Sequence, residues 1–159
     1  MDWGGWAVFG LLATTALTAV LILAQIAGFT RMDLPMMLGT LVVDDPDRAR
    51  AVGFFIHLAM GQVFAFGYAA VFALLGHAGW VLGLALGLVH ALVALTMLVP
   101  GLLPGIHPRM ATTRRGPAAG PGLEPPGPLG LNYGRQTALV TVVAHAVYGL
   151  ALGGLVGPR

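Results

Sequence analysis

Four long apolar stretches, each able to cross a bilayer, limit what this chain can fold into. A membrane-spanning helix needs about 20 apolar residues. Lipid offers the backbone no hydrogen-bond partners, so stretches of this length must be helical. We predict an all-α integral membrane four-helix bundle that forms a single domain over residues 1–159. The predicted spans cover residues 5–28, 51–75, 79–103 and 136–156.

The composition agrees with a membrane protein. Hydrophobic residues make up 57% of the chain and charged residues only 9%, against about 25% charged in a typical soluble domain. The lipid bilayer is therefore the expected partner. All basic residues are arginines in loops or at the C-terminus, which favours orientation signals over nucleic-acid binding. The chain has no cysteine and no Walker, Gly-x-Ser-x-Gly or His-Glu-x-x-His motif, so a hydrolase or an ATP-driven pump finds no support, and a protein without enzymatic activity is favoured over an enzyme.

Arginine placement predicts the orientation. Seven of the eight arginines lie in the connection between the first and second spans or in the one between the third and fourth. The 76–79 turn has none. Loops rich in arginine stay in the cytoplasm, so we predict a multi-pass protein of the plasma membrane with both termini outside. Tryptophans flank the opposite interface, as in an aromatic belt.

The two arginine-rich connections, one between the first and second spans and one between the third and fourth, differ in composition. Asp33 and His107 lie near prolines at the ends of apolar stretches, where helix capping is the favoured role. The acidic turn before Arg48 is typical of a helix start. Residues 116–134 are dominated by Gly and Pro, a composition typical of flexible segments. If this loop is ordered, we expect it to lie against another membrane subunit or against the helix ends of its own chain.

Three histidines occupy a similar depth in three different spans. His57, His90 and His145 fall within roughly one helical turn of each other along the membrane normal, at about 1.5 Å rise per residue. An imidazole in hydrocarbon must be hydrogen-bonded, metal-bound or in contact with water, because burying it unpaired costs several kcal/mol. Gln25 and Gln62 lie in neighbouring layers, and Tyr148 shares the helix face of His145. The sequence therefore predicts a polar, histidine-lined centre in the half of the bundle nearest the cytoplasm.

Three interpretations of this centre remain open. In the first, the polar side chains only bond helices together, as in a structural subunit of a larger complex without a cofactor. In the second, the centre binds a prosthetic group. His57 and His145 would ligate a haem b, with Gly61 and Gly149 one turn away leaving room for the macrocycle, or the three imidazoles would hold a transition metal. In the third, His, Tyr and Gln line the path of a small carrier or channel.

Two further patterns bear on the fold. Gly83-x-x-x-Gly87 and Gly149-x-x-x-Gly153 are typical of close helix packing. The shared spacing His57-x-x-x-Gly61 and His145-x-x-x-Gly149 is consistent with a tandem duplication of a helix hairpin.

Four segments together resemble a group of small four-span bacterial membrane proteins that have no known activity. These segments are Met32-Asp-Leu-Pro35-Met-Met-Leu-Gly39, His57-x-x-x-Gly61-x-x-Phe64-x-x-x-Tyr68, Gly87-x-x-His90 and His145-x-x-Tyr148-Gly149. The resemblance covers most of the chain apart from the Gly/Pro loop. It implies a four-helix fold and a bacterial plasma membrane, and it implies no cofactor or catalytic residue.

Overall fold

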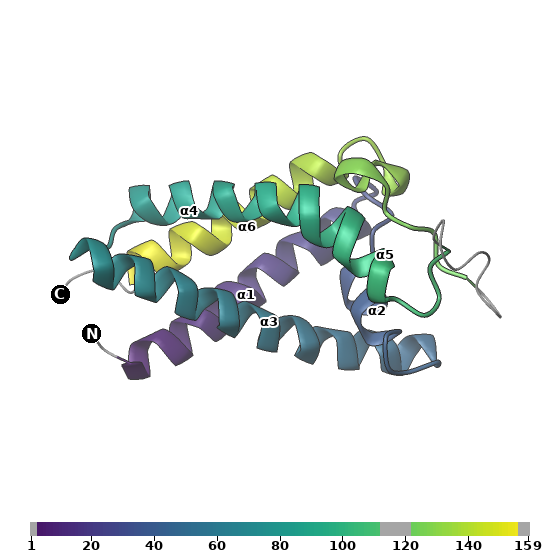
Figure 1. Cartoon of the computed structure of the whole chain (residues 1–159), viewed down its shortest axis with the longest axis horizontal. Coiled ribbons are helices and arrows are strands. Elements are labelled where there is room, and N and C mark those ends of the chain that lie inside the picture. Colours follow the sequence, from purple (N-terminus) through teal and green to yellow (C-terminus); the bar gives the residue numbers. More distant parts are fainter. Residues whose placement is uncertain (1–2, 112–121, 156–159) are drawn as a thin grey trace.

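Four long helices form an elongated bundle in the computed structural model, which describes residues 3–111 and 122–155. Both termini point to one end of the bundle, whereas the short helices and the long connections gather at the other (Figure 1). We call these the terminal end and the loop end. The elements in chain order are α1 Trp3–Ile26, α2 Leu34–Gly39, α3 Pro46–Leu75, α4 Trp80–Val93, η1 Ala94–Leu102, α5 Leu103–Ile106, η2 Pro128–Tyr133 and α6 Thr137–Leu155.

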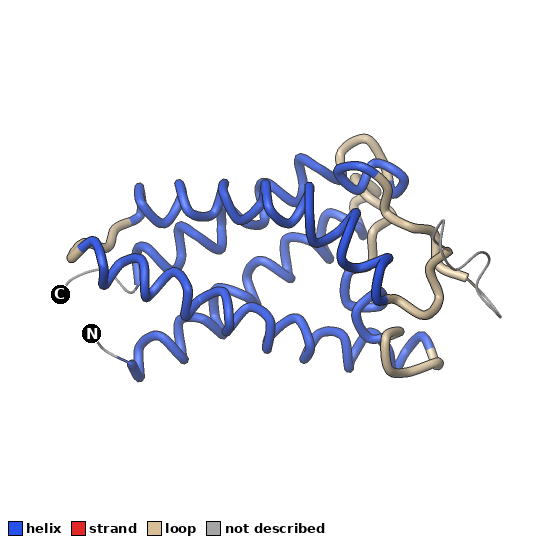
Figure 2. Tube along the Cα trace, in the orientation of Figure 1, coloured by secondary structure: helices blue, strands red, loops and turns tan. Residues whose placement is uncertain are grey.

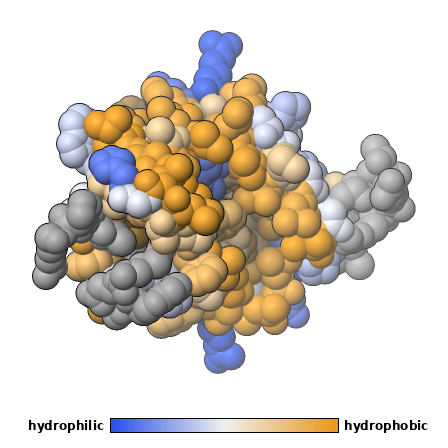
Figure 3. Space-filling model, turned by 60° about the vertical axis from the view of Figure 1, so that its left-hand side comes forward, coloured by the Kyte–Doolittle hydropathy of each residue, from blue (hydrophilic) through white to orange (hydrophobic). Residues whose placement is uncertain are grey.

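The helices confirm the predicted fold class. The described residues contain no strand, only one isolated bridge between Met110 and Leu123 (Figure 2). Apolar side chains cover most of the face turned forward in Figure 3, as expected for a surface that meets hydrocarbon. The protein is a multi-pass membrane protein. The four helices long and apolar enough to span a bilayer cover Gly5–Ile26, Pro46–Leu75, Trp80–Ile106 and Thr137–Leu155.

The order of packing leaves one seam open. α4 packs along α6, α6 along α1, and α1 along α3. The α3 and α4 backbones hardly approach each other, so the bundle is open between these two helices. Because side chains alone bridge this seam, it is the least tightly closed face of the bundle.

Glycines hold α4 and α6 together, which confirms the predicted close packing. A Cβ on Gly83 would collide with the Gly149 carbonyl oxygen, and one on Gly87 would collide with the His145 carbonyl oxygen. A Cβ on Gly153 would collide with the Gly79 carbonyl oxygen. Without side chains at these positions the two backbones touch, which is the usual basis of small-residue packing in membranes.

The third span is not a regular α-helix. After α4 the chain continues as the π-helix η1, which contains Pro100, and then as the short α5, which contains Pro104. Each proline lacks a backbone N–H, so the carbonyl four residues earlier loses its usual partner and the hydrogen-bond pattern shifts. The wider π turn displaces the following residues, and this rearrangement lies next to the open seam.

Helix caps at the loop end match the predicted roles. The Asp33 carboxylate accepts a hydrogen bond from the Met36 backbone N–H at 2.9 Å, at the start of α2, and also pairs with Arg50 at 2.8 Å. Asp45 caps α3 by accepting from the Arg48 backbone N–H at 2.9 Å. α3 therefore starts at Pro46, five residues before the predicted span, because the capped turn extends the helix beyond the apolar stretch.

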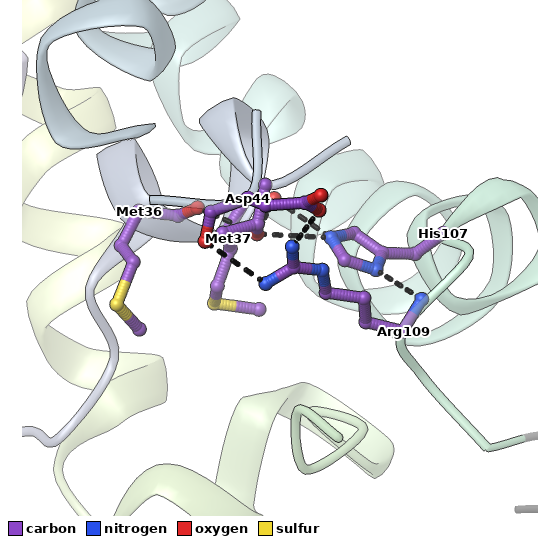
Figure 4. Close-up of polar contacts among 6 residues, drawn as sticks. Met36, Met37, Asp44, His107 and Arg109 are labelled. Carbon is purple, nitrogen blue, oxygen red and sulfur yellow. Dashed lines mark hydrogen bonds and ion pairs between the residues drawn. The ribbon is translucent and has the colours of Figure 1, made fainter. Parts of the chain in front are cut away.

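His107 fastens α5 to α2. Its Nδ1 accepts from the Arg109 backbone N–H at 3.1 Å, so its Nε2 carries a proton and donates to the Met37 carbonyl oxygen at 3.0 Å. Arg109 reaches back to pair with Asp44 (Figure 4). His107 is completely buried, so these bonds replace those that water would make.

The described part of the Gly/Pro loop lies against the helix ends of its own chain, which was one of the two predicted arrangements. Leu123 donates its backbone N–H to the Arg109 carbonyl oxygen at 2.9 Å, and η2 packs on η1 and α6. Arg31 pairs with Glu124 at 3.3 Å and donates to the Asn132 carbonyl oxygen. Residues 112–121 of the loop lie outside the described residues.

Candidate functional site

A cavity lies inside the bundle, between the open seam and the histidine layer, and extends toward the loop end. Its volume is about 160 Å³. One wall is polar, and the rest consists mainly of aliphatic side chains from α1, α2, α3 and the π-helix η1. The polar wall comprises Thr14, His57, His90, Thr141, His145 and Tyr148. The structure thus brings the three predicted histidines and Tyr148 to one cavity.

His145 bonds to its own helix. Its Nδ1 lies 2.8 Å from the carbonyl oxygen of Thr141, one turn earlier in α6. A carbonyl oxygen can only accept, so Nδ1 carries the proton, and in the neutral imidazole Nε2 has a free lone pair. The residue is only 8% exposed, and its Nε2 has no hydrogen-bond partner among the described residues. His145 therefore presents an unused acceptor in a mainly apolar interior.

His57 has the same tautomer for a different reason. Its Nδ1 lies 2.9 Å from the Thr18 hydroxyl on α1. That hydroxyl donates its single hydrogen to the Thr14 carbonyl oxygen at 2.7 Å, so it can only accept from His57. The His57 Nδ1 is then the donor. In the neutral ring, Nε2 is left as a second acceptor on the wall of the same cavity.

His90 lies between the other aromatic side chains. Its ring centroid is 4.0 Å from that of Phe64 and 4.6 Å from that of His145. The Tyr68 hydroxyl lies 3.4 Å from His90 Nδ1 and has no other hydrogen-bond partner among the described residues. Nδ1 of His90 is the only acceptor within reach of the Tyr68 hydroxyl among the described residues, so we assign Tyr68 as the donor and the His90 proton to Nε2. His90 therefore adds a donor to the cavity wall.

The two glycines predicted to form a haem cradle are used for helix packing. A Cβ on Gly61 would collide with the Thr14 hydroxyl, and one on Gly149 would collide with the Gly83 carbonyl oxygen. The Gly61 carbonyl oxygen also accepts from the Tyr148 hydroxyl at 2.6 Å, which ties α6 to α3. A flat macrocycle cannot occupy the space beside Gly61 and Gly149, because neighbouring helices fill it. The haem b hypothesis stays a prediction from the sequence.

The predicted metal ligands do not form a closed ligand set. His90 and His145 are in ring contact, but His57 bonds to Thr18 on α1. Among the described residues, no three His, Asp or Glu side chains are placed to hold a metal ion together. None of the residues lining the cavity is an acid that could neutralise the charge of a metal ion. The three-histidine metal centre stays a prediction from the sequence.

Gln25 and Gln62 lie outside the cavity wall. Gln25 lines a separate open crevice near Asp33 and Arg50 at the loop end. Gln62 donates from its side chain to the Ala7 carbonyl oxygen at 2.8 Å and so joins α3 to α1. Its Oε1 is buried without a hydrogen-bond partner among the described residues. Gln25 lies nearer the loop end than Thr18, which contacts His57, and Gln62 lies nearer the terminal end, beside Ala7 and Gly10, so neither reaches the histidines.

Three threonines contribute to the site without having been singled out in the sequence. Thr18 fixes His57, the Thr141 carbonyl fixes His145, and Thr14 packs on Gly61 and lines the cavity. The spacing Thr141-x-x-x-His145 places both residues on one helix face and was available as a signal. No sequence signal links Thr18 to His57, because that contact depends on how α1 and α3 are rotated against each other.

Comparisons with protein-family models, with curated proteins and with solved structures found no match to this chain. The resemblance to small four-span bacterial membrane proteins therefore stays a prediction. Any function must be inferred from the geometry of the cavity and its histidines.

Proposed function

We propose that this protein binds a small molecule in the cavity lined by His57, His90 and His145. The observation that carries the proposal is the hydrogen bonding of His145. A histidine that served only to join helices would bond to a neighbouring helix, but His145 donates to the carbonyl of Thr141 in its own helix. Its Nε2 is left without a protein partner among the described residues, and an acceptor without a partner in a mainly apolar cavity is costly unless something bonds to it.

Other side chains already connect the helices. Tyr148 bonds α6 to α3, Gln62 bonds α3 to α1, and the α4–α6 glycines make close backbone contact. These contacts hold the helices together without His145, which makes no hydrogen bond to another helix among the described residues. This division of roles supports a binding protein over a purely structural subunit.

The proposal includes a location. The clustering of arginines in the connections at the loop end supports placing that end in the cytoplasm and both termini outside. We place the protein in a bacterial plasma membrane, as the four-span resemblance implies. The cavity then lies in the half of the bilayer nearest the cytoplasm.

A cavity-filling variant tests the proposal. Ala94 is 6% exposed and lines the cavity from the first residue of η1, so Ala94→Phe places a ring in the ligand's space. Leu92→Phe, on the lipid-facing side of α4 at 60% exposed, is the matched control. Each protein would be extracted from bacterial membranes with its surrounding lipid and analysed by mass spectrometry for retained small molecules. An absorption spectrum of the same samples would reveal any haem.

We expect the wild type and Leu92→Phe to retain a small molecule in roughly equimolar amount, and Ala94→Phe to lose it. If the wild type and Ala94→Phe release the same molecules in the same amounts, the cavity is not a binding site and the proposal is wrong. A Soret band in the wild type that disappears in His145→Ala would instead support the haem hypothesis.

A further inference from the structure

The chemistry of the cavity wall narrows the class of ligand. Resting on the proposed binding function, we infer that the ligand is a membrane-soluble molecule with a phenol- or quinol-like ring, whose hydroxyl hydrogen-bonds to the histidines of the cavity. Three properties of the described residues carry this inference: the donors and acceptors on the wall, the size and polarity of the remaining space, and the side on which the cavity opens.

The wall offers two acceptors and one donor. His57 and His145 are each protonated on Nδ1 by their fixed partners, so their Nε2 atoms accept. His90 receives a hydrogen bond from Tyr68 and carries its own proton on Nε2, so it donates. A hydroxyl can donate to one of the two acceptors and accept from His90, whereas a ketone, an ether or a hydrocarbon would leave both acceptors unsatisfied. The wall therefore matches a hydroxyl best.

The remaining space suits a single ring. The volume of about 160 Å³ is close to the roughly 150 Å³ of an engineered apolar cavity that binds benzene. The walls away from the histidines are built from aliphatic side chains such as Leu17, Ile56 and Leu98. Phe64 stacks near His90 and adds an aromatic surface. A ring with one polar edge fits this distribution, because its carbon face meets apolar walls while its hydroxyl faces the imidazoles.

The cavity opens where lipid would be. Met60 on α3 and Leu102 and Ile106 beyond α4 line the cavity and are 37%, 55% and 54% exposed. These residues flank the seam where the α3 and α4 backbones hardly approach each other. A ligand could therefore enter from the hydrocarbon without passing through a headgroup layer. Entry on this side requires a ligand that dissolves in the membrane.

A metal ion fits the same wall less well. The residues that line the cavity include no carboxylate, so a divalent cation would be an uncompensated charge in a mainly apolar site. Cu(I) is the metal that the wall would tolerate best, because Met32 and Met60 add soft sulfur ligands to the imidazoles. Binding of Cu(I) is therefore the outcome that competes most directly with a phenol-like ligand.

The test compares two probes that differ in one hydrogen-bond donor. 4-Methylphenol and 4-methylanisole have the same ring, but only the phenol can donate to an imidazole nitrogen. The full-length protein in phosphatidylcholine nanodiscs, labelled with ¹⁵N at histidine, would be titrated with each probe at equal mole fraction in the bilayer. We expect the phenol to bind roughly threefold to tenfold more tightly, the effect of one net hydrogen bond. The ¹⁵Nε2 signal of the histidine that accepts the hydroxyl hydrogen, His145 or His57, should move with the phenol and stay in place with the anisole.

Two variants locate the contact. Of His145→Leu and His57→Leu, the variant that removes the accepting imidazole should lower phenol affinity toward that of the anisole, while anisole affinity changes little. Equal affinity for the two probes in the wild type, or unchanged ¹⁵Nε2 signals on adding phenol, overturns the inference even if a variant fails to fold. Stoichiometric binding of Cu(I) that His145→Leu abolishes also overturns it. If Ala94→Phe loses a native ligand while the two probes bind alike, the proposed function stands and only the ligand class is wrong.

Discussion

Histidines of this protein differ in role according to the group that fixes one ring nitrogen. His107 accepts from the Arg109 backbone N–H and donates to the Met37 carbonyl oxygen, so both of its nitrogens are occupied and it joins α5 to α2. His145 and His57 each have only Nδ1 hydrogen-bonded among the described residues. At the loop end, His107 thus uses both ring nitrogens to join two helices. In the membrane-spanning part, His145 and His57 each have one ring nitrogen that can accept a further hydrogen bond. The local partner decides between these roles, and burial does not, since His107 is the most buried of the three.

The tautomers can be measured directly. Long-range ¹H–¹⁵N correlation spectra should show a proton on Nδ1 for His57 and His145 and on Nε2 for His107. Thr18→Val removes the acceptor of His57 Nδ1, so we expect the His57 signals alone to show a mixture of tautomers. Thr15→Val is the matched control, because the Thr15 hydroxyl is exposed and bonds only to the Leu11 carbonyl oxygen. A change in His145 rather than His57 would contradict the hydrogen bond between Thr18 and His57.

The sequence predicts the depth of these residues but not their rotation. Depth can be counted in residues along a helix, which is why His57, His90 and His145 were expected in one layer and lie on one cavity. Rotation depends on which face of each helix packs inward, and these helices are apolar on all sides, so no polar face marks the orientation. Gln62 shows the consequence, because it lies on the same helix as His57 and bonds to the Ala7 carbonyl oxygen of α1 instead of lining the cavity.

At the scale of elements, the irregular end of the third span shapes the site. Ala94, Leu98 and Val99 of the π-helix η1 line the cavity. π-helical turns are uncommon and often occur at functional sites. Pro100 and Pro104 indicate that a regular α-helix cannot continue, but proline permits a kink, a break or a π turn. The sequence thus locates the irregular segment but does not specify its π-helical form.

The glycine contacts between α4 and α6 predict a matched pair of variants. Gly149→Ala forces a methyl group into the Gly83 carbonyl oxygen, so we expect a loss of stability of about 1–3 kcal/mol from overpacking. Gly154→Ala lies in the same helix with nothing near its Cβ, and it should be neutral or stabilising by up to about 1 kcal/mol through helix propensity. Unfolding of both variants in detergent micelles, followed by circular dichroism, checks the difference. Equal stability of the two variants would show that the α4 and α6 backbones do not touch at these glycines.

The predicted hairpin duplication has one structural parallel. In both halves the glycine four residues after a histidine packs on the first long helix of its own half: Gly61 on Thr14 of α1, and Gly149 on Gly83 of α4. The two histidines, however, find different partners, since His57 bonds across to α1 and His145 bonds within α6. The duplication itself stays a prediction. If it occurred, the halves have diverged most at the contacts that fix the imidazoles.

At the scale of the whole molecule, charge and apolar surface are separated along the bundle axis. The described arginines all lie at the loop end, where Arg31, Arg50 and Arg109 pair with acidic side chains. Trp80 is exposed at the opposite end, next to the 76–79 turn. Partly neutralised arginines still count as orientation signals, because carboxylates contribute little to the positive-inside rule. The asymmetry therefore favours one orientation of the bundle over the other.

Single cysteines can read this orientation, since the chain contains none of its own. Val42 is 69% exposed in the turn between α2 and α3 at the loop end, and His77 is exposed in the turn between α3 and α4 at the terminal end. In intact spheroplasts we expect a membrane-impermeant maleimide to label His77→Cys at once and Val42→Cys only after the membrane is permeabilised. The cysteine-free parent protein controls for background labelling. The reverse pattern would place the loop end outside and move the cavity to the outer half of the bilayer. The contacts of His57, His90 and His145 would be unchanged, so the ligand proposal would survive with entry from the other leaflet.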